Sequence, residues 1–148
     1  NMLTITSPAF INNGKIPIEY TCKGKGISPA LKIENIPPQT QSLVLIMDDP
    51  DAPIGVFTHW LIWNIAPDTS EIKENSVPVN AVVGLNSRGE NKYTPPCPPS
   101  GTHRYFFKIF ALGTTLNLPR ETSQKQLEEA INEHIIDSGE LIGLFNRD

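Results

Sequence analysis

The chain has 148 residues, of which 39% are hydrophobic and 19% charged, and its formal net charge is −4. This composition is typical of a folded globular protein and not of a disordered or a membrane protein. No apolar run approaches the roughly 20 residues that a membrane helix needs, and no basic cluster points to a nucleic-acid partner. The first residues lack a charged segment followed by an apolar one, so we expect no secretory signal in this form of the chain. We therefore expect a single cytoplasmic domain, residues 1–148, without stable membrane insertion.

Short β-like runs separated by turn residues dominate the chain. Residues 3–6 alternate weakly between apolar and polar, and Asn12-Asn13-Gly14 is a strong turn signal. Further along, four runs rich in apolar, branched and aromatic residues predict strands: 42–47, 60–65, 77–85 and 105–112. Pro78 makes the third of these an edge strand or a bent strand, because proline cannot donate to a ladder. The pattern predicts a mainly β fold.

A helix is predicted only over residues 123–137. Ser123 and Gln126 have the spacing of a capping box. From Leu127 to Ile135, apolar side chains recur at helical spacing and His134 falls on the same stripe, so we expect that histidine to be half-buried and outside any binding site. Gly139 is expected to end the helix, with a last short turn over residues 141–145.

The first polar cluster follows the apolar run 42–47. It contains Asp48, Asp49 and Asp51 within four residues, and His59 comes shortly after. Each proline in this loop restricts the residue before it to extended or turn conformations, so the loop is pre-shaped. Carboxylates this close repel one another unless they are hydrogen-bonded or solvated. The alternative is an ordinary surface turn in which aspartate caps backbone donors.

The second polar cluster lies where a proline-rich loop, residues 93–101, meets the run 105–112. Strand alternation places His103 and Tyr105 on one face and Arg104 on the other. Histidine and tyrosine can donate hydrogen bonds to an anion, and a nearby aspartate could orient the imidazole ring. Arg104 is expected to pair with one of the aspartates. The alternative is that His103 and Tyr105 are simply core or rim residues.

Other chemistries are less well supported by the residues. Asp49, Asp51, His59 and His103 include ligand types that bind metals, but their spacing does not favour a metal site. The motifs of nucleotide-binding proteins, metalloproteases and serine hydrolases are missing. Cys22 and Cys97 do not have zinc-site spacing. They are either two free thiols or one long-range disulfide, and we expect reduced thiols in a cytoplasmic protein.

Taken together, these segments resemble the phosphatidylethanolamine-binding protein family. The runs DDPDAP, HWLIWNIAP and PPSGTHRYFFKIFAL are similar to its two signature regions. The run YTCKG followed by ISP is similar to an early family element, with Lys23 where aspartate is usual. Residues 84–87, 93–99 and 133–143 resemble the bacterial and archaeal, Raf-kinase-inhibitor-like branch, so the likeness covers almost the whole chain.

The resemblance implies a large antiparallel sheet, a smaller second sheet and peripheral C-terminal helices. It implies that the two signature regions meet in a cavity that takes phosphate, acetate or a phospholipid head group, with no cofactor and no metal. A cis peptide bond before Pro53 is also expected from the family. Carried over position by position, the ligand-binding residues are Asp49, Pro50, Ala52, Pro53, His59, Pro98, Pro99, His103 and Tyr105.

The leading functional hypothesis is therefore non-enzymatic binding of small anions or phosphorylated head groups. Family members restrain protein kinases or proteases, so such a partner is a further expectation, as is a homodimer. Because a protonated histidine would carry the positive charge that attracts the anion, anion affinity is expected to rise as the pH falls from 8 to 5. One alternative is a weak hydrolase or transferase using His59, His103 and Asp49, with no catalytic residue assigned. Another is a dimeric interaction module whose pocket has lost its role.

Overall fold

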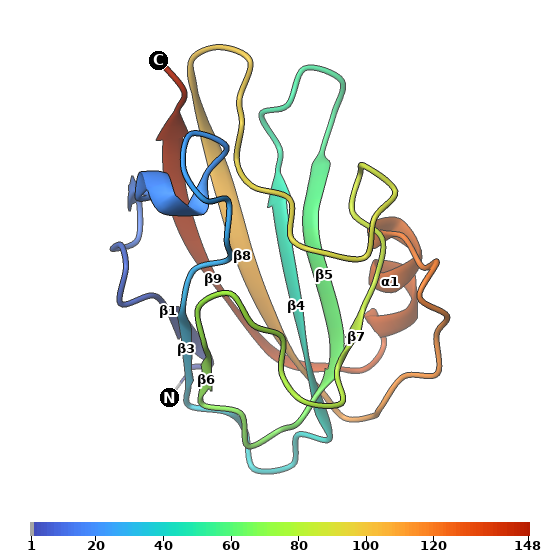
Figure 1. The fold of residues 1–148 in the computed structure, drawn as a ribbon. Coiled ribbons are helices and arrows are strands. Elements are labelled where there is room, and N and C mark those ends of the chain that lie inside the picture. Colours follow the sequence, from blue (N-terminus) through green and yellow to red (C-terminus); the bar gives the residue numbers. More distant parts are fainter. Residues whose placement is uncertain (1) are drawn as a thin grey trace.

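A six-stranded sheet lies at the centre of the computed structural model, which describes residues 2–148 (Figure 1). Neighbouring strands are antiparallel except β2 and β9, which are parallel. In order across the sheet, the strands are β2 (Gly14–Lys15), β9 (Ile135–Asn146), β8 (Thr102–Leu112), β4 (Ser42–Asp49), β5 (Phe57–Ile65) and β7 (Val82–Val83).

A smaller antiparallel sheet and two short helices complete the fold. The small sheet has the order β1 (Thr4–Thr6), β3 (Leu31–Glu34) and β6 (Glu71–Ile72). The helices are the 3₁₀ helix η1 (Ile18–Tyr20) and the α-helix α1 (Gln124–Ile131). The mainly β architecture with two sheets is confirmed. Across residues 2–148, neither helix has the length and apolar character that crossing a membrane requires.

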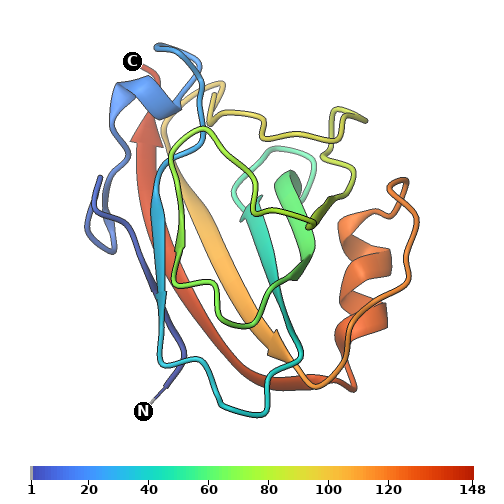
Figure 2. The ribbon, with the colours of Figure 1, turned by 60° about the horizontal axis from the view of Figure 1, so that its bottom comes forward.

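The central sheet is covered on both faces, which explains the continuous apolar run in β4. Leu43, Leu45 and Met47 belong to the larger core cluster, which lies between the central sheet and the small sheet. Val44 and Ile46 belong to a second cluster under α1. In Figure 2 the small sheet lies on one side of the central strands and α1 on the other. A strand buried on both faces loses the apolar–polar alternation of a half-exposed strand.

The predicted C-terminal helix is only partly correct. The capping box of Ser123 and Gln126 is present, but α1 ends at Ile131 and the chain continues as the 12-residue strand β9. Only this one α-helix occurs within residues 2–148, where peripheral C-terminal helices were expected. His134 is exposed and does not lie on a helix, so its predicted half-buried position is wrong.

Gly139 does not end a helix. It lies within β9, where an added Cβ would collide with the main-chain carbonyl of Leu3. Further along β9, Leu141, Gly143 and Phe145 are buried at every second position. This spacing is the period of a strand, and β9 pairs along its length with β8. The residues assigned to a last short turn therefore form the sheet partner of the strand that carries His103 and Tyr105.

Candidate anion-binding site

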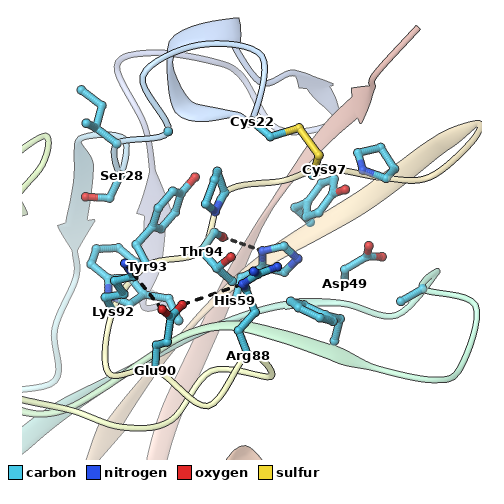
Figure 3. A pocket seen from close by; sticks show the side chains of 18 of the residues that line it. Cys22, Ser28, Asp49, His59, Arg88, Glu90, Lys92, Tyr93, Thr94 and Cys97 are labelled. Carbon is cyan, nitrogen blue, oxygen red and sulfur yellow. Dashed lines mark hydrogen bonds and ion pairs between the residues drawn. A yellow bond between two sulfur atoms is a disulfide. The ribbon is translucent and has the colours of Figure 1, made fainter.

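A cavity of about 1040 Å³ opens at the end of the central sheet, where β4 ends and β8 begins (Figure 3). The loop of residues 93–101 forms one wall, and the loop after β4 contributes another. The structure brings eight of the nine predicted ligand-binding residues to this cavity: Asp49, Ala52, Pro53, His59, Pro98, Pro99, His103 and Tyr105. Pro50 is the exception, because it is exposed and does not line the cavity.

A β-bulge turns His59 into the cavity. Met47 lies opposite Trp60 but Asp48 lies opposite Thr58, so β5 carries one extra residue, His59, at this point. Such a bulge lets two successive side chains share a face. His59 and Trp60 both line the cavity, whereas the Thr58 hydroxyl donates to Gln124 of α1 on the opposite face, at 2.6 Å.

Asp49 holds His103 in a fixed orientation. The Nδ1 atom of His103 donates to Asp49 Oδ2 at 2.7 Å, and both side chains are buried. The other carboxylate oxygen, Oδ1, accepts the main-chain N–H of Asp51 at 2.8 Å. Because an ionised carboxylate can only accept, Nδ1 of the ring carries the hydrogen, and Nε2 remains for the cavity. The predicted orienting role of an aspartate is thus present in the geometry.

His59 is held by the main chain of the proline-rich loop. Its Nδ1 donates to the carbonyl oxygen of Thr94 at 2.6 Å, and the Thr94 N–H donates back to the His59 carbonyl at 3.0 Å (Figure 3). Burial lowers the pKa of His59 below its ordinary 6.5, although the Thr94 hydrogen bond and the carboxylates of Asp49 and Asp48 act in the opposite direction. The ring is therefore neutral near pH 7.

Tyr105 supplies a hydrogen-bond donor that has no partner within residues 2–148. Its ring packs edge-on to His59, with centroids 5.2 Å apart, and stacks near His103 at 6.4 Å. The hydroxyl group is buried and makes no hydrogen bond. Burial, together with the charge of Asp49, raises the pKa of this phenol, so it keeps its proton. An unsatisfied buried polar group costs about 1–3 kcal/mol, and a ligand that accepted from it would remove that cost.

The three aspartates of the first polar cluster lie in three different environments. Asp48 faces α1, where Lys108 Nζ lies 3.0 Å and Gln124 Nε2 2.8 Å from its Oδ2. Asp51 accepts from Nε and Nη2 of Arg104, at 2.9 and 2.8 Å, as predicted for an arginine that points away from the site. These bonds lower the pKa of Asp51 to about 2. Of the three, only Asp49 lines the cavity, and within residues 2–148 no group of three or more histidine, cysteine, aspartate or glutamate side chains is placed to hold a metal ion.

The family model described as phosphatidylethanolamine-binding protein matches residues 6–146. The chain belongs to the phosphatidylethanolamine-binding protein family. It is 49% identical to a UPF0098 protein of Pyrococcus horikoshii, over 95% of this chain and 75% of that protein. It is 44% identical to a UPF0098 protein of Methanothermobacter thermautotrophicus, over 98% of this chain and 99% of that protein.

Solved structures of this family superpose closely on the chain. A phosphatidylethanolamine-binding protein homologue of Chlamydia trachomatis gives a TM-score of 0.96 at 41% identity, covering 100% of this chain and 99% of the other. YbcL of E. coli, described as a new member of the mammalian family, gives 0.93 at 24% identity and covers all of both chains. The second likeness concerns the fold alone. The expected family is thereby confirmed.

Two expectations about the cavity wall are wrong for this family member. Cys22 and Cys97 form a disulfide, with Cα atoms 5.4 Å apart, where reduced thiols were expected. Residues 75 positions apart become neighbours because the loop after η1 packs against the proline-rich loop, a proximity that only the fold creates. The peptide bond before Pro53 is trans, as are the others within residues 2–148.

Sequence reasoning missed the wall of the cavity that lies away from Asp49. Arg88, Glu90 and Lys92 gather there (Figure 3), with Glu90 carboxylate oxygens 3.8 Å and 3.7 Å from the two cations. Asn86 shapes this loop, because its side chain accepts from the N–H groups of Arg88 and Glu90 and donates to the Lys92 carbonyl. The signal was available as three alternating charges before the aromatic Tyr93, which packs edge-on to Trp60.

Proposed function

We propose that this protein binds small anions, and phosphorylated groups in particular, in the cavity beside Asp49, and that it does so without turnover. The observation that carries the proposal is the Tyr105 hydroxyl, a buried donor with no partner among residues 2–148. Few buried polar groups in folded proteins lack a partner, and a cavity-lining donor without one favours a ligand that accepts from it.

The residues around Tyr105 suit a small anion. His103, fixed by Asp49, presents its Nε2 side to the same cavity. Lys25, Arg88 and Lys92 line the outer part and give it a positive potential that attracts anions. Glu90 offsets part of this charge, and the exposed Arg88–Glu90 and Lys92–Glu90 pairs contribute little to stability.

Binding is favoured over catalysis by the state of the cysteines. Cys22 and Cys97 both line the cavity but are bonded to each other, so neither supplies a thiolate nucleophile. The alternative, a weak hydrolase or transferase using His59, His103 and Asp49, predicts turnover of a phosphorylated or acyl compound that His103→Ala abolishes. Binding without turnover supports the leading proposal.

The regulatory role remains part of the proposal. A kinase or protease whose activity depends on this protein would be a partner of the kind the family suggests, and a homodimer is proposed on the same grounds. The cytoplasmic location inferred from the sequence stays a proposal, and the Cys22–Cys97 disulfide counts against it because disulfides persist mainly in oxidising compartments. Light scattering on wild type and on the Asp49→Ala and His103→Ala variants separates two cases. If the variants lose anion binding but still form the homodimer and keep its biological effect, then the surface and not the cavity carries the function.

The decisive experiment is an NMR titration of labelled protein with inorganic phosphate and O-phosphorylethanolamine at pH 6. Saturable shifts of His59, His103, Tyr105 and the Asp49 loop are expected in wild type and not in His103→Ala. His134→Ala is the matched control, because it removes an exposed histidine that does not line the cavity. The proposal is wrong if phosphate causes no shift at these residues in wild type.

A further inference from the structure

His59 presents a hydrogen-bond acceptor, not a donor, to the cavity. Its Nδ1 hydrogen is used by the Thr94 carbonyl at 2.6 Å, so in the neutral ring Nε2 carries a lone pair. No residue within 2–148 donates to Nε2, and this atom is not fully buried. Because His59 lines the cavity, this lone pair is available to whatever the cavity holds.

The neutral ring is a consequence of the site's construction. Its neighbours on the adjoining strands are Asp49 and Asp48 of β4, which favour the protonated ring, and His103 of β8, which disfavours it. Burial outweighs the two carboxylates and lowers the pKa of His59. The Thr94 carbonyl belongs to a loop that the Cys22–Cys97 disulfide ties down three residues later, so the tautomer is fixed by the fold.

A donor and an acceptor therefore belong to two neighbouring rings that both line the cavity. The Tyr105 hydroxyl donates, His59 Nε2 accepts, and the two rings lie 5.2 Å apart. A fully ionised tetrahedral anion has only acceptor oxygens. It would satisfy Tyr105 and leave lone pair facing lone pair at His59, where no hydrogen bond can form.

We propose that the site selects singly protonated phosphate or a phosphomonoester monoanion, whose remaining P–OH group donates to His59 Nε2 while another oxygen accepts from Tyr105. The inference rests on the proposed anion binding and names the ligand's protonation state. The proton travels with the ligand and the ring stays neutral. Sulfate has the same shape but no hydrogen, and a phosphodiester has none on its phosphate, so both are rejected. The phosphate of an intact phospholipid is a diester, so this inference narrows the expected head-group ligands to phosphomonoesters.

The preference for ligands with a P–OH group over sulfate and phosphodiesters should equal the cost of one hydrogen bond that is not made to the desolvated acceptor His59 Nε2. Such a loss corresponds to about a 10- to 100-fold weaker affinity. The pH dependence follows from the ligand, because a phosphomonoester loses its second proton with a pKa of about 6. Above that pH each binding event takes up one proton from solution, so the apparent affinity falls about tenfold per pH unit. Below it the affinity is nearly constant.

Calorimetry on the intact, oxidised protein tests the selection with four probes: inorganic phosphate, methyl phosphate, sulfate and dimethyl phosphate. At pH 6, we expect the two ligands that carry a P–OH group to bind at least tenfold more tightly than the other two. Methyl phosphate should lose about tenfold in affinity between pH 7 and pH 8. Sulfate binding within threefold of phosphate overturns the inference but leaves anion binding standing, whereas no binding of any probe overturns both.

The location of the proton is read directly from ¹⁵N NMR of the His59 ring in the phosphate complex. A neutral ring with hydrogen on Nδ1 supports the proposal, and a ring with both nitrogens protonated contradicts it. In the His59→Gln variant the terminal amide can turn its NH₂ toward the ligand, so the phosphate-to-sulfate ratio should fall below about threefold. His134→Gln, an exposed histidine away from the cavity, should keep the wild-type ratio. The NMR measurement on wild type stands whether or not His59→Gln folds.

Discussion

Removing the disulfide between Cys22 and Cys97 should destabilise the protein by about 4.5 kcal/mol. The two residues lie 75 positions apart, so the bond closes a loop of about half the chain. In the chain-entropy account, a cross-link restricts the unfolded ensemble by an amount that grows with the logarithm of the loop length, which for this separation amounts to about 4.5 kcal/mol at 25 °C. The perturbation is the double variant Cys22→Ser with Cys97→Ser, which leaves no unpaired thiol behind.

The assay is guanidinium chloride unfolding of the oxidised wild type and the variant, together with a thermal scan. For a chain of this size each 1 kcal/mol corresponds to about 2–4 °C, so the unfolding midpoint should fall by roughly 9–18 °C. The slope of the free energy against denaturant should rise in the variant, because an unfolded chain without the cross-link exposes more surface. Wild type reduced with a thiol reagent serves as the control and should behave like the variant.

A difference below about 1 kcal/mol between oxidised wild type and the double variant would refute this reasoning. It would mean that the unfolded chain already keeps the loop after η1 close to the proline-rich loop, so that the bond restricts little. A large loss of stability with an unchanged denaturant slope would instead place the effect in the folded state, in the packing of the cavity wall around Cys97.

Two further predictions concern other parts of the fold. Gly84→Ala should destabilise the protein by about 1–3 kcal/mol in denaturant unfolding, because the new Cβ would lie 2.5 Å from Cζ3 of the buried Trp63. Gly113→Ala is the control: the nearest neighbour of its new Cβ would be 3.8 Å away, so its stability should stay within about 0.5 kcal/mol of wild type. Arg104→Gln should make the free energy of unfolding depend less steeply on pH between pH 2 and pH 4. In wild type, Arg104 lowers the pKa of Asp51 from 3.8 to about 2, so the stability contributed by Asp51 is present above pH 4 and is lost as the pH falls toward 2. Unfolding free energies at pH 2–5 measure this, and equal slopes in variant and wild type would contradict it.

Three strands of the central sheet were predictable because their composition and period agree. The runs 42–47, 60–65 and 105–112 lie within β4, β5 and β8, and the capping box starts α1. The helix end failed because Ile131 and Ile135 satisfy the helical spacing while Ile135 also begins a strand. Local periodicity cannot choose between the two when residues are shared. The pairing of β9 with β8, a tertiary interaction, makes the choice.

The cavity was predictable in its residues more than in its chemistry. His103 and Tyr105 share a face through simple alternation, and the prolines mark the loops around them. The orientation of His59 depends on a bulge that shifts the β4–β5 register by one residue, and no local signal announces it. Its protonation pattern depends on the Thr94 carbonyl, 35 residues away. Contacts of this range are set by the fold.

The arrangement of the three aspartates explains how the proposed anion site would tolerate an acidic loop. Alternation along β4 sends Asp48 to the α1 face, and the turn after β4 sends Asp51 outward to Arg104, so two of the three charges are paired away from the cavity. The remaining carboxylate, Asp49, already accepts from His103 and from a main-chain N–H. An anion beside Tyr105 would therefore meet a carboxylate whose two oxygens already accept hydrogen bonds, and these bonds reduce its repulsion of the anion. The conformation at the end of β4 and in the proline-restricted loop therefore directs two of the three carboxylates away from the cavity and leaves the third, Asp49, to orient His103.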